Sequence, residues 1–231
     1  MLARAGANPY TRIMTAGPTV AWVGDGLVAW VGRGPWGPVA GAIGDVTGAV
    51  RLFGTLYAAG ELHDVQRVHL PRTPLTAVDG HLRITDHEDW DFRWLAGPLA
   101  THPAEHRAVR LGPADAPAID ELLDRVLPRT PSRPGSSRVR GWWGIRADGR
   151  LVACAADRSV GRLGLLAAIA VHPDAQGRGF GGALTTAMSR SLLAEYGEVA
   201  LGVDADNTRA IALYTRLGFT GTVPRTTIWF A

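Results

Sequence analysis

The chain has 231 residues, a formal net charge of +3 and a hydrophobic fraction of 46%. This length allows one large or two small domains with a substantial core, and the composition is that of an ordinary globular protein. No apolar run reaches the roughly 18 to 20 residues of a membrane span, and no stretch combines dense basic charge with aromatic residues, as nucleic-acid-binding proteins do. The N-terminus lacks a signal-peptide pattern, and the single Cys154 excludes an internal disulfide. We therefore expect a cytoplasmic protein that binds neither membrane nor nucleic acid.

The first hundred residues show a mixed α/β pattern. Gly24-Asp25-Gly26 lies between two apolar runs and predicts the turn of a hairpin. Residues 43–57 carry apolar side chains at intervals of three and four (Ile43, Val46, Val50, Phe53 and Tyr57), which predicts a helix. The expected strands of this part are residues 19–23, 27–31, 65–70 and 92–95.

Helix and strand breakers near residue 100 indicate a domain boundary. Gly97-Pro98 and His102-Pro103 interrupt the chain, and a new pattern begins at residue 106. We therefore expect a smaller N-terminal α/β domain over residues 1–103 and a second domain over residues 104–231. In the second domain the expected strands are residues 108–111, 142–146, 151–155, 163–171, 199–203 and 226–230, and the expected helices are residues 115–127, 183–195 and 207–217.

The most informative stretch is residues 169–182, with the sequence IAVHPDAQGRGFGG. An apolar strand ends at Val171, a short connector follows, and a glycine-rich turn then opens a helix. Backbone N–H groups at the start of a helix point toward a ligand, and glycine lets a phosphate approach the backbone closely. The stretch therefore predicts a phosphate-binding loop, to which Arg178 can add a charge-assisted hydrogen bond.

Two classes of ligand compete for this loop. Gly177, Gly179 and Gly182 match the G-x-G-x-x-G pattern of dinucleotide-binding folds, and Asp204 lies roughly where a ribose-binding carboxylate is expected. In those folds the first glycine follows the strand directly, whereas here residues 172–176 intervene. Only about 50 residues remain after the loop, too few for two halves of a doubly wound sheet. This context disfavours a dinucleotide.

An acyl-CoA ligand accounts for more of the residues. Val171-His172-Pro173, then Gln176-x-x-Gly179-x-Gly181 and a helix, resembles the acyl-CoA loop of the GNAT N-acetyltransferase superfamily. Residues 207–219, NTRAIALYTRLGF, resemble the N-x-x-A-x-x-L-Y-x-x-x-G-F segment of that superfamily, at the expected interval. The resemblance covers about residues 106–231. It implies a GNAT-like, mixed and mostly antiparallel twisted sheet flanked by helices, with residues 1–103 as a candidate degenerate GNAT-like half.

The resemblance also implies which residues bind the donor, acetyl-CoA. Two strands, ending at Val171 and near Val203, would splay apart at a bulge and admit the pantetheine arm between them. A backbone N–H there would polarise the acetyl carbonyl, and the loop amides would bind the pyrophosphate. Gln176 is expected to order the loop and Phe180 to anchor it. The predicted donor-binding residues are Ile169, Ala170, Val171, Gln176, Gly177, Arg178, Gly179, Phe180, Gly181, Gly182 and Asn207.

The catalytic residues are less completely specified by the sequence. By resemblance, Tyr214 is the general acid that protonates the departing thiolate, although a buried core tyrosine is the alternative interpretation. Asn207 either only caps its helix or also reaches the pantetheine. An amine near pKa 10 must lose a proton before attack, but the positions where relatives carry a glutamate hold apolar residues and Gly202. Three candidates remain to accept the proton of the amine: Asp204, a relay of water molecules, or a residue of the N-terminal region.

We therefore expect an acetyl-CoA-dependent N-acetyltransferase that uses no metal. The acceptor would be a primary amine of a small molecule or a protein, acetylated directly in a ternary complex. The missing base keeps open an alternative, a non-catalytic acyl-CoA sensor or interaction protein. The sequence names neither the acceptor nor the oligomeric state, for which a homodimer is the prior expectation.

Overall fold

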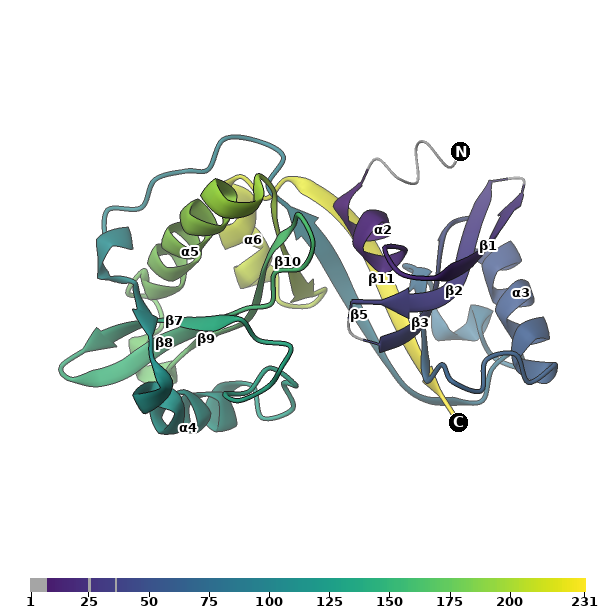
Figure 1. Ribbon diagram of the computed structural model, residues 1–231, viewed down its shortest axis with the longest axis horizontal. Helices are drawn as coiled ribbons and strands as arrows, with labels where there is room; N and C mark the ends of the chain where they lie inside the picture. Colours follow the sequence, from purple (N-terminus) through teal and green to yellow (C-terminus); the bar gives the residue numbers. More distant parts are fainter. Residues whose placement is uncertain (1–7, 25, 36) are drawn as a thin grey trace. The chain divides into compact units, whose positions relative to one another are not determined.

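The computed structural model describes residues 8–24, 26–35 and 37–231. These residues form two compact units (Figure 1). Unit 1 consists of the described residues up to Phe92, together with Val203–Asn207 and Thr222–Ala231, and unit 2 consists of Arg93–Gly202 and Thr208–Gly221. The domain limits at residues 103 and 104 stay a prediction, because packing into units does not show which segment folds by itself.

Unit 1 is built on an open sheet with the strand order β1-β2-β3-β4-β11-β5. Strands β1, β2 and β3 pair antiparallel, β3 and β4 pair parallel, and β4 and β11 pair antiparallel. The hairpin predicted around Gly26 is confirmed, and its residue Asp25 lies outside the described residues. The elements are α2 (Pro9–Met14), β1 (Thr19–Gly24), β2 (Leu27–Gly34), β3 (Gly37–Gly44), α3 (Val46–Ala58), β4 (Arg67–Pro71), η1 (Leu75–Ala77), β5 (Ile84–Trp94) and β11 (Gly221–Phe230).

Helix α3 covers one face of this sheet and begins later than its apolar spacing suggested. The carboxylate of Asp45 accepts hydrogen bonds from the N–H groups of Thr47 and Gly48, both at 3.0 Å, and so caps the helix. Ile43 belongs instead to β3, where it pairs with Val28, so its assignment to the helix was wrong. The helix start is fixed by the Asp45 cap, which the periodicity of the preceding apolar residues does not reveal.

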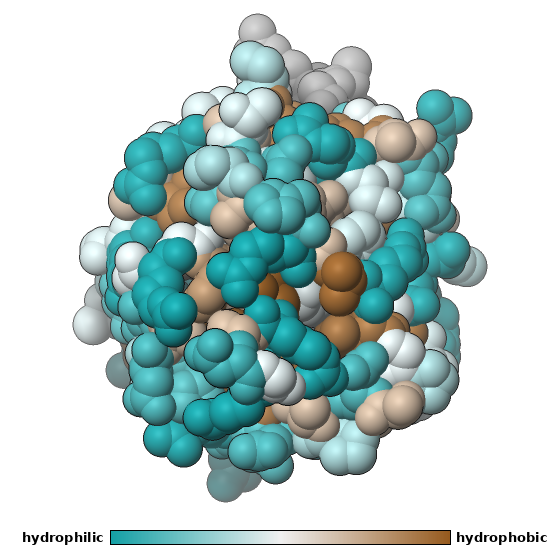
Figure 2. All heavy atoms as spheres, turned by 90° about the vertical axis from the view of Figure 1, so that its left-hand side faces the viewer, coloured by the Kyte–Doolittle hydropathy of each residue, from teal (hydrophilic) through white to brown (hydrophobic). Residues whose placement is uncertain are grey.

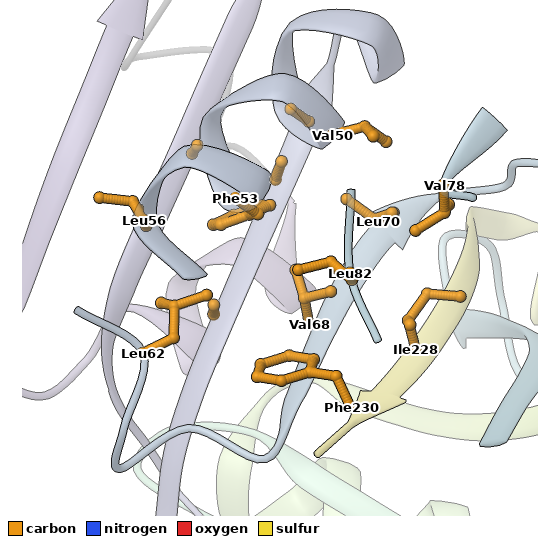
Figure 3. Close-up of a cluster of buried hydrophobic side chains, with 14 of the residues drawn as sticks. Val50, Phe53, Leu56, Leu62, Val68, Leu70, Val78, Leu82, Ile228 and Phe230 are labelled. Atoms are coloured by element: carbon orange, nitrogen blue, oxygen red, sulfur yellow. The ribbon is translucent and has the colours of Figure 1, made fainter. Parts of the chain in front are cut away.

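The core of unit 1 lies between α3 and the sheet (Figure 3). Val50 and Phe53 of α3 face Val68 of β4 and Ile228 of β11, and all four are at most 2% exposed. Since β11 comes from the end of the chain, the last ten residues complete the core of the N-terminal unit.

A buried arginine fixes β11 in unit 1. The Arg225 guanidinium donates hydrogen bonds to the carbonyl oxygens of Ala42 in β3 and His69 in β4, and its carbon lies 4.8 Å from the ring centroid of Tyr10 in α2. Burial lowers the pKa of Arg225. The side chain therefore links three strands and α2 through two carbonyl acceptors and one aromatic face.

Unit 2 contains the sheet order β10-β9-β8-β7-β6, in which β9 and β10 are parallel and the other neighbours antiparallel. The expected fold class, a mixed and mostly antiparallel sheet flanked by helices, is confirmed. The elements are η2 (Glu105–Arg107), β6 (Val109–Leu111), η3 (Pro113–Asp115), α4 (Ala116–Val126), β7 (Gly141–Ala147), β8 (Arg150–Asp157), β9 (Gly164–Val171), η4 (Pro173–Ala175), α5 (Phe180–Tyr196), β10 (Val199–Asp204) and α6 (Thr208–Leu217).

Two helices cover opposite faces of the unit 2 sheet (Figure 1). Ile119 and Leu123 of α4 pack with Cys154 of β8 and Ala170 of β9, all at most 1% exposed. On the other face, α5 approaches so closely that a Cβ at Gly164 would lie 2.7 Å from Cβ of Leu192. β9 is therefore covered on both faces, which accounts for its continuous apolar sequence.

The surface of the described residues carries few large apolar side chains. Only Val20, Val23 and Val109 are both large, hydrophobic and exposed among them. Figure 2 shows a mostly hydrophilic face with small, separate apolar patches. In the same residues no helix is both long and apolar enough to cross a bilayer, and no group of three His, Cys, Asp or Glu side chains could hold a metal ion. The cytoplasmic location stays a prediction.

Candidate functional site

The two parallel strands of unit 2 pair over only part of their length. The β9–β10 ladder joins Gly164 to Val199 and Leu166 to Leu201, and it ends there. Strand β9 continues to Val171. Its last five residues thus extend beyond the ladder and present an edge of backbone N–H and C=O groups that β10 does not pair. This is the splay predicted from the sequence.

A bulge bends β9 where the ladder has ended. On the β8 side, Cys154 pairs with Ala170 and Ala156 with Ala167, so β9 has one residue more than β8 over this interval. Ala168 has φ +48°, which is uncommon for a residue other than glycine. An extra residue of this kind leaves its backbone groups out of the ladder and re-aims the strand. The bulge is confirmed and lies next to Ile169.

The connector after β9 is fixed by side chains. His172, 7% exposed, accepts a hydrogen bond at its Nδ1 from the N–H of Asp174 (3.3 Å), and thereby caps η4. The amide of Gln176 donates to the carbonyl of Val171 (3.4 Å) and accepts from Arg209 of α6 (3.1 Å). The structure therefore gives Gln176 the loop-ordering role that the sequence suggested, and it gives His172 a similar role.

The loop glycines are required for different reasons. Gly177 and Gly179 have φ values of +78° and +81°, in the left-handed region that favours glycine. Gly181 has no such constraint, and the nearest atoms to a Cβ there would be Val171 Cγ2 at 3.5 Å and Leu213 Cδ2 at 3.7 Å. The fold therefore leaves room for a methyl group at residue 181, and a ligand is the natural reason for keeping this position bare.

The start of α5 provides free backbone donors. The first helical hydrogen bond of the segment runs from the Ala183 N–H to the Gly179 carbonyl at 3.0 Å. Consequently the N–H groups of Phe180, Gly181 and Gly182 have no acceptor within the helix. α5 is 17 residues long, and its dipole adds positive potential at this end. Such a helix start is suited to bind a phosphate group.

Two arginines flank the first residue of α5. The guanidinium carbons of Arg178 and Arg107 lie 5.1 and 4.9 Å from the ring centroid of Phe180, which is 3% exposed. Both are cation–π contacts. Phe180 is thus a buried anchor, as predicted, and it holds two positive charges beside the glycine loop.

His102 also belongs to this site, and the sequence did not identify it. Its ring lies 3.4 Å from a Cβ position on Gly179 and 3.0 Å from one on Gly182. The ring is oriented by the Ala104 N–H, which donates to Nδ1 at 3.2 Å. A two-hydrogen-bond ion pair between Glu105 and Arg190 holds the segment on α5. No sequence signal could reveal this contact, because it joins residues 77 to 80 positions apart.

Tyr214 lies in α6 and is buried, with only 6% of the residue exposed. Its ring centroid lies 6.1 Å from that of Phe219. Asn207 immediately precedes α6 and belongs to unit 1, where its N–H donates to the carbonyl of Asp204 at 3.1 Å. Strand β9 contains no ionisable side chain. The catalytic role of Tyr214 and the donor-binding role of Asn207 stay predictions.

Comparison with known proteins agrees with this geometry. The family model described as FR47-like protein matches residues 143–230, which include the bulge, the glycine loop and α6. A mycothiol acetyltransferase of Clavibacter sepedonicus is 31% identical over 185 residues, 79% of this chain and 56% of that protein. A mycothiol acetyltransferase of Streptomyces griseus is 50% identical over 60 residues, 26% of this chain and 20% of its own length. These matches support the GNAT superfamily, which the sequence motifs resemble.

Solved structures show the same GNAT fold over nearly the whole chain. A GNAT-family protein of Novosphingobium aromaticivorans superposes with a TM-score of 0.61 at 24% identity, covering 98% of this chain and 94% of that one. A GCN5-related N-acetyltransferase of Kribbella flavida superposes with a TM-score of 0.57 at 17% identity, covering 99% of this chain and 94% of that one. By contrast, the chain spans just over half the length of the Clavibacter relative. The GNAT motifs include Gln176, Gly179, Gly181 and Tyr214, whereas His102 and Arg107 lie outside them.

Proposed function

We propose that this protein transfers the acetyl group of acetyl-CoA to a primary amine, directly and within a ternary complex. The observation that supports this most is the combination of an unpaired, bulged β9 edge with a glycine loop at the start of α5. An extended amide-containing ligand can pair with such an edge as an added strand would. A phosphate can bind the adjoining helix start. A pantetheine arm joined to a pyrophosphate contains both groups in this order.

The donor site is proposed to consist mainly of backbone. Ile169, Ala170 and Val171 would hydrogen-bond the pantetheine amides, and the N–H groups of residues 177–182 would bind the pyrophosphate. The bare Cα of Gly181 fits this arrangement, since a ligand can occupy the space that a side chain would fill. Arg178 would add a charge-assisted hydrogen bond. Asn207 is proposed as a further donor-binding residue on the strength of its motif position alone.

The chemistry requires one C–N bond to form and one C–S bond to break. A backbone N–H at the β9 bulge would stabilise the negative charge that develops on the carbonyl oxygen. The amine loses one proton to solvent, and the departing thiolate accepts one from the Tyr214 hydroxyl. Because β9 supplies no carboxylate, deprotonation of the amine is proposed to run through water. The acceptor is then bound in its minor, neutral form, which predicts a rate that rises with pH.

Turnover is the test of this function. Release of CoA thiol from acetyl-CoA is measured across a panel of primary amines. The first amine is the acceptor of the mycothiol acetyltransferases, because the chain is similar to those enzymes. We expect amine-dependent thiol release by the wild-type chain and none by Gly181→Glu, whose carboxylate would repel the pyrophosphate. Arg138→Gln, at an exposed position outside the loop, is the matched control.

The alternative, a non-catalytic acyl-CoA sensor, is motivated only by the missing base, and the relatives named acetyltransferases do not favour it. The same assay distinguishes the two. Tight binding of acetyl-CoA with no thiol release for any amine or protein acceptor would contradict the enzyme and support the sensor.

A further inference from the structure

A second candidate site lies in unit 2, outside the glycine loop. Helix α4 and the β7–β8 hairpin enclose a cavity of about 180 Å³, which we call the hairpin cavity. The residues that line it are Ala118, Glu121, Leu122, Arg125, Arg146, Gly149, Arg150, Leu151 and His172. None of the loop glycines is among them. We propose that the hairpin cavity binds a phosphate group, as inorganic phosphate or as the phosphomonoester of a small molecule.

The mouth of the cavity carries uncompensated positive charge. Arg125 on α4 and Arg150 on β8 are both exposed, and within the described parts of the chain neither forms an ion pair. Glu121 is the only carboxylate among the lining residues, so two free guanidiniums face one negative charge. A planar guanidinium binds two oxygens of a phosphate at once, which suits it to this ligand.

Arg146 is held in place by other contacts. Its Nη2 lies 2.5 Å from Asp115 Oδ1, and its Nη1 donates to the carbonyl of Gly149 at 3.2 Å. These bonds fix the guanidinium against the hairpin turn, and the Asp115 carboxylate neutralises its charge. Arg146 thus shapes the wall, while the net attraction for an anion comes from Arg125 and Arg150.

The floor of the cavity contributes an imidazole nitrogen. His172 is 93% buried, and its Nδ1 accepts the N–H of Asp174. With Nδ1 engaged by that hydrogen bond and 3.6 Å from Asp174 Oδ2, Nε2 is the ring nitrogen able to donate into the cavity. Among the described residues, no group hydrogen-bonds to Nε2. An anion in the cavity would give this N–H an acceptor.

The arrangement favours phosphate over carboxylate. The donors come from three separate elements, namely α4 through Arg125, the hairpin through Arg150 and the connector after β9 through His172. A tetrahedral phosphate presents oxygens in several directions, whereas a carboxylate presents two in one plane. Leu122 and Leu151, both buried, form apolar walls that limit the volume to a compact group.

The direct test observes His172 during titration of the intact chain. Two-dimensional NMR of the imidazole nitrogens, assigned with His172→Gln, is recorded with inorganic phosphate, glycerol phosphate and acetate, each against sodium chloride of equal ionic strength. We expect a saturable shift of His172 Nε2 with one or both phosphates and none with acetate. If only inorganic phosphate shifts the Nε2 signal, the ligand is the free anion. If glycerol phosphate shifts it too, the cavity also accommodates a phosphomonoester.

Variants separate this cavity from the helix start, which also attracts phosphate. Arg125→Gln and Arg150→Gln should each lower the phosphate association constant about tenfold, and Arg138→Gln should leave it unchanged. Gly181→Glu blocks the loop and should retain the His172 shift. The proposal is overturned if His172 does not respond to either phosphate, or if its response survives both arginine substitutions unchanged but disappears in Gly181→Glu.

Discussion

The imidazole of His102 covers Gly182 in the first turn of α5, so that a Cβ atom at residue 182 would approach His102 Cδ2 to 3.0 Å. Packing within the protein therefore already disfavours a side chain at the last glycine of the loop. At Gly181, one position earlier, a Cβ would make only ordinary van der Waals contacts, at 3.5 and 3.7 Å. Adjacent glycines of one motif thus have separate physical roles, and substitutions can tell them apart.

The contact between His102 and Gly182 predicts an energetic coupling. Alanine is favoured over glycine inside a helix by up to about 1 kcal/mol, but at residue 182 the close approach of the His102 ring should cancel that gain. In a His102→Ala background the gain should return. We expect a coupling free energy of about 1 kcal/mol from urea denaturation of the four proteins in this double-mutant cycle. Strict additivity would show that the ring moves aside freely.

Gly179 and Gly181 should respond oppositely to alanine. Gly181→Ala should raise the free energy of unfolding by up to about 1 kcal/mol, because its φ is ordinary and a methyl group fits. Gly179→Ala should lower it by about 1 to 2 kcal/mol, because residue 179 has φ +81°. Chemical denaturation measures both. Equal effects of the two substitutions would contradict the left-handed geometry of the loop.

The Glu105–Arg190 ion pair predicts a pH-dependent stability. Hydrogen bonds from Arg190 lower the pKa of the Glu105 carboxyl below its ordinary value. The pair therefore stabilises the fold above the unfolded-state pKa of about 4.3, and this contribution is lost as the pH falls through the lower folded-state pKa. Both side chains are partly exposed, so Glu105→Gln should cost less than about 1 kcal/mol at pH 7.

The corresponding measurement compares Glu105→Gln with the wild type in urea at pH 7 and at pH 3. The difference should shrink at the lower pH. Glu61→Gln, at an exposed position of unit 1, provides the matched control and should show no such trend. If the loss of unfolding free energy in Glu105→Gln grows as the pH falls, the effect has the opposite sign to that expected of this ion pair.

Cys154 should be chemically inert in the native protein. Burial in the α4-facing core raises the pKa of its thiol to about 12 and leaves the sulfur inaccessible. At pH 8 only about one thiol in ten thousand would be ionised. Iodoacetamide labelling followed by mass spectrometry should detect modification in denaturant and almost none in its absence. Fast native labelling would mean that β8 is not buried as described.

Much of unit 2 was predictable because its elements carry regular patterns. The continuous apolar run of β9, the Asp148-Gly149 turn between β7 and β8, and the glycine at each end of α5 are local signals, and the observed bounds differ by only a few residues. In unit 1, β3 and most of β5 were missed. β3 is rich in glycine and alanine, and β5 exposes most of its polar first half, so neither shows the apolar alternation of a strand.

The donor loop was likewise predictable from its residues, whereas the groups that pack on it were not. His102 and Arg107 reach the start of α5 from a segment that precedes β6, and the sequence gives no reason to connect them. The same holds for Arg225, which reaches β3 and β4 from the end of the chain. Such contacts depend on tertiary packing alone.

Tyr214→Phe tests the proposed general acid. Loss of the hydroxyl should lower kcat about a hundredfold, the lower range for a general acid, and should leave the affinity for acetyl-CoA nearly unchanged. Steady-state kinetics with the best amine, together with calorimetric binding, separate the two quantities. An unchanged kcat would give Tyr214 the purely structural role that its burial and its contact with Phe219 also allow.

The central claim is that the loop from Gln176 to Gly182 binds an acyl-CoA. Isothermal titration of the intact chain with acetyl-CoA tests it most directly, with Gly181→Ala and Gly181→Glu as a matched pair. We expect one site per chain in the wild type, retained binding in Gly181→Ala and loss of binding in Gly181→Glu, with all three proteins folded. Absence of binding by the wild type, or equal binding by Gly181→Glu, would contradict it.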